Sequence, residues 1–248
     1  MIKTLITLAG ALSLIAPVAQ ADMLGFKFGI QGWSQSVDGG YGVTQDFPDY
    51  NIDGDTAMTG YVSFEHPLPL VPNVKLRFSD YDADGNNALA DDVSIGGVVI
   101  PAGTEFKAVV DAKTIDYIMY YEVLDFDVGS LDLGLNVRQL DGDVRLVTDV
   151  ETGSESLDSF IPMFYGAAST EFPFSGISAY GEFNYIKYDG SKLLDWQLGL
   201  GYKVIDSLAL NLTAQLGYRV SHYELDDIDN IYGDLKYDGA YLGVEAHF

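Results

Sequence analysis

The sequence predicts an all-β protein: a transmembrane, antiparallel up-and-down β-barrel of about ten strands, with long loops at one end and short turns at the other. Three observations predict it. Apolar and polar residues alternate with period two in segment after segment, so each strand has one apolar and one polar wall. The connections between these segments alternate between long and short. Glycine (27 residues), tyrosine (17) and phenylalanine (13) are abundant, which favours strands and turns over helices.

The first element is a targeting segment. Lys3 gives a short positive start, residues 4–21 are uncharged and mostly apolar, and Ala19-Gln20-Ala21 forms a small-x-small cleavage site. This pattern predicts a secretory signal peptide over 1–21 and a mature barrel domain over 22–248. The alternative is an uncleaved membrane anchor, which the short apolar core and the cleavage site disfavour.

Ten strands follow in order. They are predicted at 24–31, 58–65, 74–79, 115–123, 131–138, 160–171, 177–185, 194–203, 208–219 and 240–248. The fourth is typical: Tyr117 and Met119 alternate with Asp116 and Tyr120. The sixth is less regular because Pro162 interrupts it. An even number of strands returns both termini to the side of the short turns.

The connections distinguish the two ends of the barrel. Short turns are predicted at 67–73, 124–129, 173–176 and 205–207, and a further short connection at 189–192. Long loops are predicted at 35–56, 80–112, 140–158 and 220–238. Long outer loops and short periplasmic turns are typical of outer-membrane barrels.

Alternation alone does not decide which wall faces outward, because a soluble lipocalin-like barrel alternates with its apolar wall inside. The polar wall carries bulky charges of both signs in nearly every strand, which favours a charge-paired lumen. Aromatic residues near the ends of the apolar stripes suit interfacial girdles. The predicted lumen charges are Lys27, Glu65, Lys75, Arg77, Asp116, Glu122, Asp132, Arg138, Glu182, Asp195, Lys203, Arg219 and Glu245.

The chain ends on an aromatic residue, Phe248, inside its last alternating strand. This terminus resembles the C-terminal signature of outer-membrane proteins, and the mature chain resembles an uncharacterised family of small Gram-negative outer-membrane β-barrel proteins. The resemblance implies that Phe248 serves as an assembly signal. It also implies insertion by the barrel-assembly machinery and a location in the bacterial outer membrane, after export through the periplasm. It carries over no catalytic residue.

Composition excludes other classes. The formal net charge of −24 disfavours nucleic-acid binding, which needs a basic surface. The absence of cysteine excludes disulfide frameworks and cysteine-based zinc sites. After the signal peptide, no uncharged run approaches the ~20 apolar residues that a transmembrane helix needs.

The predicted long loops are rich in carboxylates, which suit Ca²⁺ or Mg²⁺ bridging to lipopolysaccharide phosphates. The stretch 80–86 reads D-x-D-x-D-G-N and resembles an EF-hand calcium loop, with Gly85 at position 6. It departs from that pattern by ending on an aspartate and by lacking flanking helices. The alternative is an ordinary Asp/Gly turn. The candidate ligands are Asp80, Asp82, Asp84, Asn86 and Asp91.

A catalytic function has little support. His222 alone among the three histidines lies on the long-loop side, and no second half of an active site is recognisable. We therefore expect no enzyme and no required cofactor. The favoured function is a structural or surface-interaction barrel in contact with outer-membrane lipid and lipopolysaccharide; the alternative is a narrow, porin-like channel for small solutes. Large inward charges in so narrow a barrel favour a mostly plugged lumen. The sequence does not indicate the oligomeric state.

Overall fold

The structure, a computed structural model, describes residues 24–42, 51–89, 92–126, 128–207, 209–228 and 231–248. The predicted signal peptide and the candidate ligand Asp91 lie outside these residues. None of the described residues forms a helix long and apolar enough to cross a membrane.

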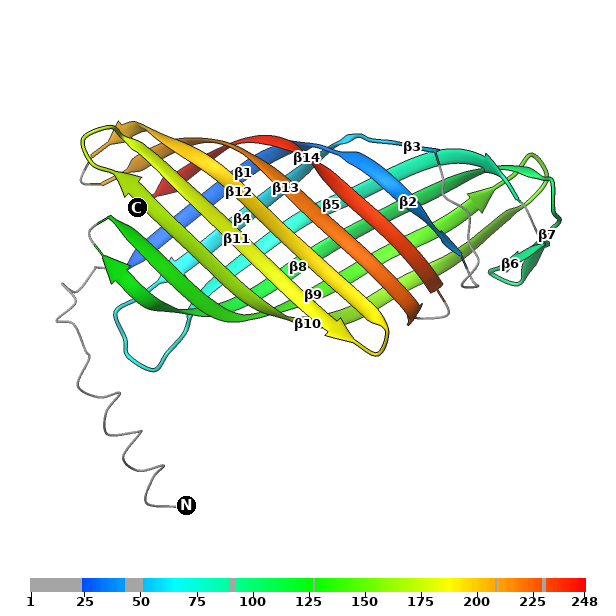
Figure 1. The fold of residues 1–248 in the computed structure, drawn as a ribbon, viewed down its shortest axis with the longest axis horizontal. Helices are drawn as coiled ribbons and strands as arrows, with labels where there is room; N and C mark the ends of the chain where they lie inside the picture. The colour runs from blue at the N-terminus through cyan, green and yellow to red at the C-terminus, as the bar shows by residue number, and fades with distance from the viewer. Residues whose placement is uncertain (1–23, 43–50, 90–91, 127, 208, 229–230) are drawn as a thin grey trace, which may run out of the picture.

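The described chain is almost entirely strand (Figure 1). The main sheet contains β1 (Gly25–Ser34), β2 (Ser36–Gly42), β3 (Asn51–Asp53), β4 (Thr56–Glu65), β5 (Asn73–Ala88), β8 (Glu105–Phe126), β9 (Gly129–Val147), β10 (Thr152–Phe172), β11 (Ile177–Tyr188), β12 (Ser191–Asp206), β13 (Asn211–Ile228) and β14 (Ile231–His247). A separate hairpin contains β6 (Val93–Ile95) and β7 (Val98–Ile100).

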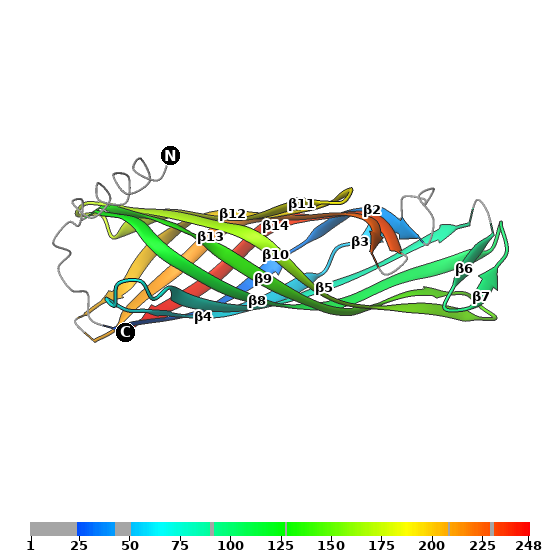
Figure 2. The same ribbon diagram turned by 90° about the horizontal axis from the view of Figure 1, so that it is seen from below.

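Neighbouring strands pair antiparallel in chain order, and β1 pairs with β14, which closes the barrel. The closing register matches Lys27 with His247 and Trp33 with Tyr241. Because β2 continues β1 after Gln35, and β3 leads into β4, the closed barrel has ten strands, as predicted. Figures 1 and 2 place the two ends of the described chain, at β1 and β14, at the same end of the barrel, called here the inner end.

The strands extend further toward the opposite, outer end than the sequence analysis predicts. The segments 80–112, 140–158 and 220–238 are mostly strand, because β5 continues to Ala88 and β8 begins at Glu105, while β9, β10, β13 and β14 also reach far into them. In 35–56, β2 and β3 take up part of the predicted loop. These segments keep the period-two alternation, but here the apolar residues point inward and the polar residues point outward. This is the reverse of the arrangement in the inner half, and the sequence pattern is therefore interrupted between the two halves.

Strand β8 shows the exchange. At its outer end Phe106 and Val110 point inward and are buried, while Lys107 and Asp111 point outward. In the inner half the outward positions are apolar instead, and the buried inward residues include a charged one. Along the strand, the outward residues thus change from mostly polar, which suits water, to apolar, which suits an apolar surrounding. The inward residues change in the opposite sense, from apolar only to a set that includes a buried charge.

The outer half of the barrel encloses an apolar core. Its buried residues come from nearly every strand and include Trp33, Val37, Tyr81, Phe106, Val144, Leu146, Leu157, Leu235 and Tyr237. The β6–β7 hairpin adds Ile95 and Ile100 to this core and lies at the outer end in both ribbon views (Figure 2). Its two-residue turn requires glycine, since Gly96 and Gly97 have φ values of 57° and 76°.

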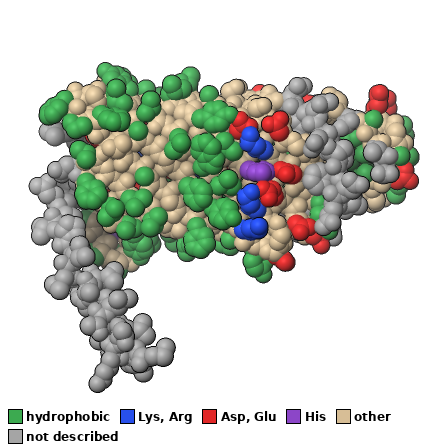
Figure 3. All heavy atoms as spheres, viewed as in Figure 1, with side chains coloured by type: hydrophobic (Ala, Val, Ile, Leu, Met, Phe, Trp, Pro, Cys, Tyr) green, Lys and Arg blue, Asp and Glu red, His purple; other side chains and the backbone are tan. Residues whose placement is uncertain are grey.

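The inner half is surrounded by exposed apolar side chains, called here the apolar belt. Every barrel strand contributes at least one: Phe28, Met58, Phe78, Met119, Leu135, Phe164, Phe183, Leu198, Leu216 and Leu242. Figure 3 shows this belt as a broad band of hydrophobic side chains next to a band of charged ones. The predicted orientation, apolar outward and ionic inward, holds throughout this half.

The belt ends toward the outer side at a row of charges. Across four neighbouring strands the first charged outward residues are register partners: Asp80 with Lys113, Lys113 with Asp141, and Asp141 with Asp158. This charged row therefore follows the hydrogen-bonding direction from β5 to β10, which is oblique to the barrel axis because the strands are tilted (Figure 1).

Candidate functional site

The buried centre of the inner half is an ionic network formed by predicted lumen charges. Its cations are Lys75, Arg77, Arg138 and Arg219, and its anions are Asp116, Glu182 and Asp195. The other predicted lumen residues, Lys27, Glu65, Asp132, Lys203 and Glu245, lie nearer the inner end, where they line a cavity. Glu122 lies beside the β-bulge of β8 and is exposed.

The outer part of the network is centred on Asp195 of β12. Arg138 from β9 donates to both carboxylate oxygens of Asp116 (2.7 and 2.9 Å) and to Asp195 (2.7 Å). Arg219 from β13 donates to the two oxygens of Asp195 (2.8 and 3.2 Å) and stacks over Trp33, with 4.8 Å between its guanidinium carbon and the ring centroid. Two buried guanidinium groups thus share one carboxylate.

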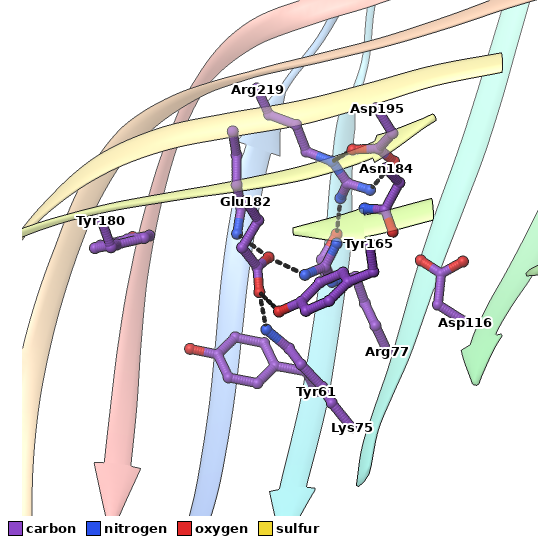
Figure 4. A network of polar contacts seen from close by, with 12 residues as sticks. Tyr61, Lys75, Arg77, Asp116, Tyr165, Tyr180, Glu182, Asn184, Asp195 and Arg219 are labelled. Carbon is purple, nitrogen blue, oxygen red and sulfur yellow. Dashed lines mark hydrogen bonds and ion pairs between the residues drawn. The ribbon is translucent and has the colours of Figure 1, made fainter. Parts of the chain in front are cut away.

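The inner part of the network is centred on Glu182 of β11 (Figure 4). Its carboxylate accepts hydrogen bonds from Lys75 and Arg77, which lie on β5 across the barrel. Tyr165 and the Nε2 of Gln197 also donate to it, at 3.1 and 2.7 Å. The Lys75 and Arg77 contacts join β5 to β11, which are not neighbours in the sheet, so they cross the interior, whereas Tyr165 and Gln197 reach Glu182 from the flanking strands β10 and β12.

The aromatic members of this network are not among the lumen residues that the sequence predicts. The hydroxyl of Tyr81 accepts from Arg219 (2.9 Å), and that of Tyr223 accepts from Arg138 (2.9 Å). Both rings occupy inward positions, and the inward parity of β5 and β13 is the signal that locates them. Inward glycines make room for other rings: a Cβ on Gly199 or Gly217 would lie within 2.5 Å of the Tyr241 hydroxyl.

Between the ionic network and the inner end lies a cavity of about 390 Å³, called here the inner cavity. Its wall includes Lys27, Glu65, Asp132, Glu182 and Glu245. The ionic network closes its outer side, and the apolar core fills the barrel beyond.

The candidate calcium ligands do not form an EF-hand-like loop. Asp80, Asp82, Asp84 and Asn86 lie in the extended strand β5, all at outward positions, and each is in register with a residue of β8. A calcium loop instead turns around its ion. Burial and the neighbouring carboxylates of Asp111 and Asp80 raise the pKa of Asp82. No group of three or more acidic, histidine or cysteine residues suited to a metal ion occurs among the described residues; binding by these residues stays a prediction.

His222 lies on the outward face of β13 just beyond the apolar belt. Its Nε2 is hydrogen-bonded to Asp234 (2.7 Å), and its Nδ1 lies 3.6 Å from Glu224. The adjacent hydroxyl, Ser221, points inward and is within 3.4 Å of Asp195. The two side chains are thus on opposite faces of the sheet, and they do not form a nucleophile–base pair.

Phe248 exchanges backbone hydrogen bonds with Phe26 of β1 (2.9 and 3.2 Å) and is exposed at the edge of the apolar belt. The predicted role of this residue in assembly stays a prediction.

No family model matches the chain, and no curated protein sequence matches it. Among solved structures, the chain is similar to the transport unit of the autotransporter AIDA-I from Escherichia coli (7% identity, TM-score 0.42, covering 98% of this chain and 95% of that one). It is also similar to the outer membrane protein AlkL in DMPC lipid bilayers (11%, 0.34, 94% of each chain) and to a Pseudomonas aeruginosa FadL homologue (11%, 0.32, 92% and 90%). All three likenesses are remote, and the architecture follows from the strand pairing itself.

Proposed function

We propose that this chain is an integral β-barrel protein of the bacterial outer membrane, closed to solute flow, which acts structurally and through the surface of its outer half. The apolar belt supports membrane insertion. An exposed apolar surface of this extent on every strand is costly in water and stable in lipid.

The observation that supports the closed state is that side chains fill the barrel from the ionic network through the apolar core, beyond the inner cavity. The buried ionic network fills the centre of the inner half, and an apolar core fills the outer half. Water and ions have no wide path through such an interior, which is consistent with the packing expected of a narrow barrel.

The test is conductance in planar lipid bilayers. The purified, folded barrel is expected to insert without producing current steps in symmetrical salt. Reproducible single-channel steps from the wild-type protein would contradict the closed state and favour the alternative function, a narrow channel for small solutes. Uptake of small sugars by liposomes containing the protein gives a second, independent measurement.

The proposed location has its own test. Membrane fractionation is expected to place the mature chain in the outer membrane, and heating in detergent is expected to change its gel mobility, as for a folded barrel. A mature chain that is folded and monomeric in buffer without detergent would contradict insertion.

For the surface role, we propose that the outward carboxylates of the outer half attract divalent cations, which bridge to lipopolysaccharide phosphates. Asp82, Asp111 and Asp143 are register partners across β5, β8 and β9. Their mutual repulsion is relieved by a divalent cation. A calcium titration of the wild type against the Asp82→Asn, Asp84→Asn variant tests this; equal affinity in both would contradict a contribution of these residues.

A further inference from the structure

The inner cavity has a lining that the closed-barrel function does not use. Its volume of about 390 Å³ is in the range of small-molecule sites. Residues from opposite sides of the barrel form its wall, including Lys27 of β1, Asp132 of β9 and Gln197 of β12. The cavity is thus a single chamber inside the barrel rather than a surface groove.

The charges in this wall are unbalanced. Each of its lysines is already paired with a carboxylate: Lys27 with Glu65 (2.8 Å), Lys75 with Glu182, and Lys203 with Glu171 (2.9 Å). Glu182 is shared with a second cation, Arg77. Two further carboxylates remain, so the negative charges still outnumber the positive ones by one.

Asp132 and Glu245 also line the cavity, and neither forms an ion pair with a lysine or arginine of the described residues. Glu245 accepts a hydrogen bond from the Tyr61 hydroxyl (2.5 Å). The cavity therefore carries excess negative charge, which favours a cationic ligand.

Two buried polar atoms of the wall lack any hydrogen-bond partner, the Oε1 of Gln197 and the Oδ1 of Asp132. Gln197 is only 4% exposed. Its Nε2 donates to Glu182, which only accepts when ionised, so the orientation of the amide is fixed and the free atom is its oxygen. The amide oxygen is an acceptor, and so is the carboxylate oxygen when Asp132 is ionised, so a ligand that satisfies them must donate hydrogen bonds. Neighbouring side chains cover both atoms, and a ligand reaches them after a small side-chain movement.

Three tyrosines of the wall have no free hydrogen-bond donor to offer a ligand. The hydroxyls of Tyr61, Tyr120 and Tyr165 already donate to Glu245, Glu65 and Glu182. The Lys75 ammonium lies 4.5 Å from the centroid of the Tyr61 ring, so a ring of this wall already contacts a cation.

We propose that the inner cavity binds a small organic cation with several N–H donors, of the class of aliphatic diamines and guanidino compounds. Asp132 and Glu245 supply the counter-charge, and Gln197 supplies a neutral acceptor. This inference is independent of the proposed closed state, because the cavity ends at the ionic network and binding requires no passage through the barrel.

The experiment is isothermal titration of the folded, detergent-solubilised mature chain with putrescine, compared with butane-1,4-diol, which has the same chain length but no charge. We expect saturable binding of putrescine at one site and none of the diol. Equal binding of the two would overturn the proposal in favour of a polyol site, and absence of putrescine binding would overturn it outright. This comparison needs no variant.

Variants locate the site. Asp132→Asn and Glu245→Gln keep the shape of the side chains and remove the charge, and each is expected to weaken putrescine binding about tenfold, as loss of a charged hydrogen bond does. The matched control is Asp111→Asn on the outward face of β8, which is expected to leave the affinity unchanged. Binding that Asp111→Asn weakens as much as Asp132→Asn belongs to the acidic outer surface and contradicts the proposal.

Discussion

Replacing Asp195 by asparagine tests the ionic network at its most connected point. Asp195 is 1% exposed and holds two buried guanidinium groups, those of Arg138 and Arg219. In Asp195→Asn the shape is kept, but the carboxylate charge is lost and the amide directs one N–H₂ group at these cations. Arg138 keeps its bidentate partner Asp116, whereas Arg219 has no other ion pair among the described residues.

The expected cost is that of leaving a buried charge without a partner, about 3–5 kcal/mol in the free energy of unfolding. A matched exposed pair gives the contrast. Lys203 and Glu171 are 2.9 Å apart at the inner end, with side chains 27% and 55% exposed. Glu171→Gln is therefore expected to cost less than about 1 kcal/mol.

The assay is equilibrium unfolding in urea of the barrel in lipid vesicles, followed by tryptophan fluorescence and by heat-modifiable gel mobility. A second variant, Asp195→Asn with Arg219→Met, removes the unpaired cation and is expected to recover much of the lost stability. If Asp195→Asn costs no more than Glu171→Gln, or if the double variant is no more stable than the single one, the network does not hold the barrel as described.

Three further predictions concern the walls of the barrel. Gly199→Ala places a Cβ 2.5 Å from a facing tyrosine hydroxyl and is expected to lower the free energy of unfolding by about 1–3 kcal/mol. The control is Gly32→Ala, whose Cβ meets no atom closer than 3.9 Å and which is expected to be nearly neutral in the same urea assay. Leu135→Arg in the apolar belt is expected to cost about 2–4 kcal/mol, against less than about 1 kcal/mol for Val109→Arg on the outer half; equal costs would contradict the assigned membrane position. Because the pKa of Asp82 is raised in the folded state, its ionised form opposes folding above that pKa, so Asp82→Asn is expected to raise stability at neutral pH and to lose this effect in acid. Unfolding midpoints measured across pH check the sign.

The inner half of the fold is predictable from sequence because lipid imposes a strict rule on it. Every outward position there must be apolar, so the parity of Tyr117 and Met119 also assigns Asp116 to the interior. In the outer half the outward positions are mostly polar because they contact water, and the inward positions are apolar because they contact a packed core. Phe106 and Val110 alternate as regularly as the inner residues, but the many nearby aspartates suggested a loop.

It is harder to predict which charged residues form ion pairs with each other inside the barrel. Parity places Lys75 and Glu182 on the inner wall, but β5 and β11 are far apart in the sheet, and their contact depends on the stagger and curvature of the closed barrel. The inner cavity is likewise a product of closure. Only the mixture of opposite charges at inward positions hints at it in the sequence.

The charged row at the outer edge of the apolar belt has a consequence for how the protein fits its membrane. Successive outward residues on a strand are about 7 Å apart along it. Sinking the barrel deeper would carry Asp80, Lys113, Asp141 and Asp158 toward hydrocarbon one after another, because the row runs obliquely across tilted strands. The energy cost therefore rises with each charge that enters, and the protein limits how deeply it is immersed.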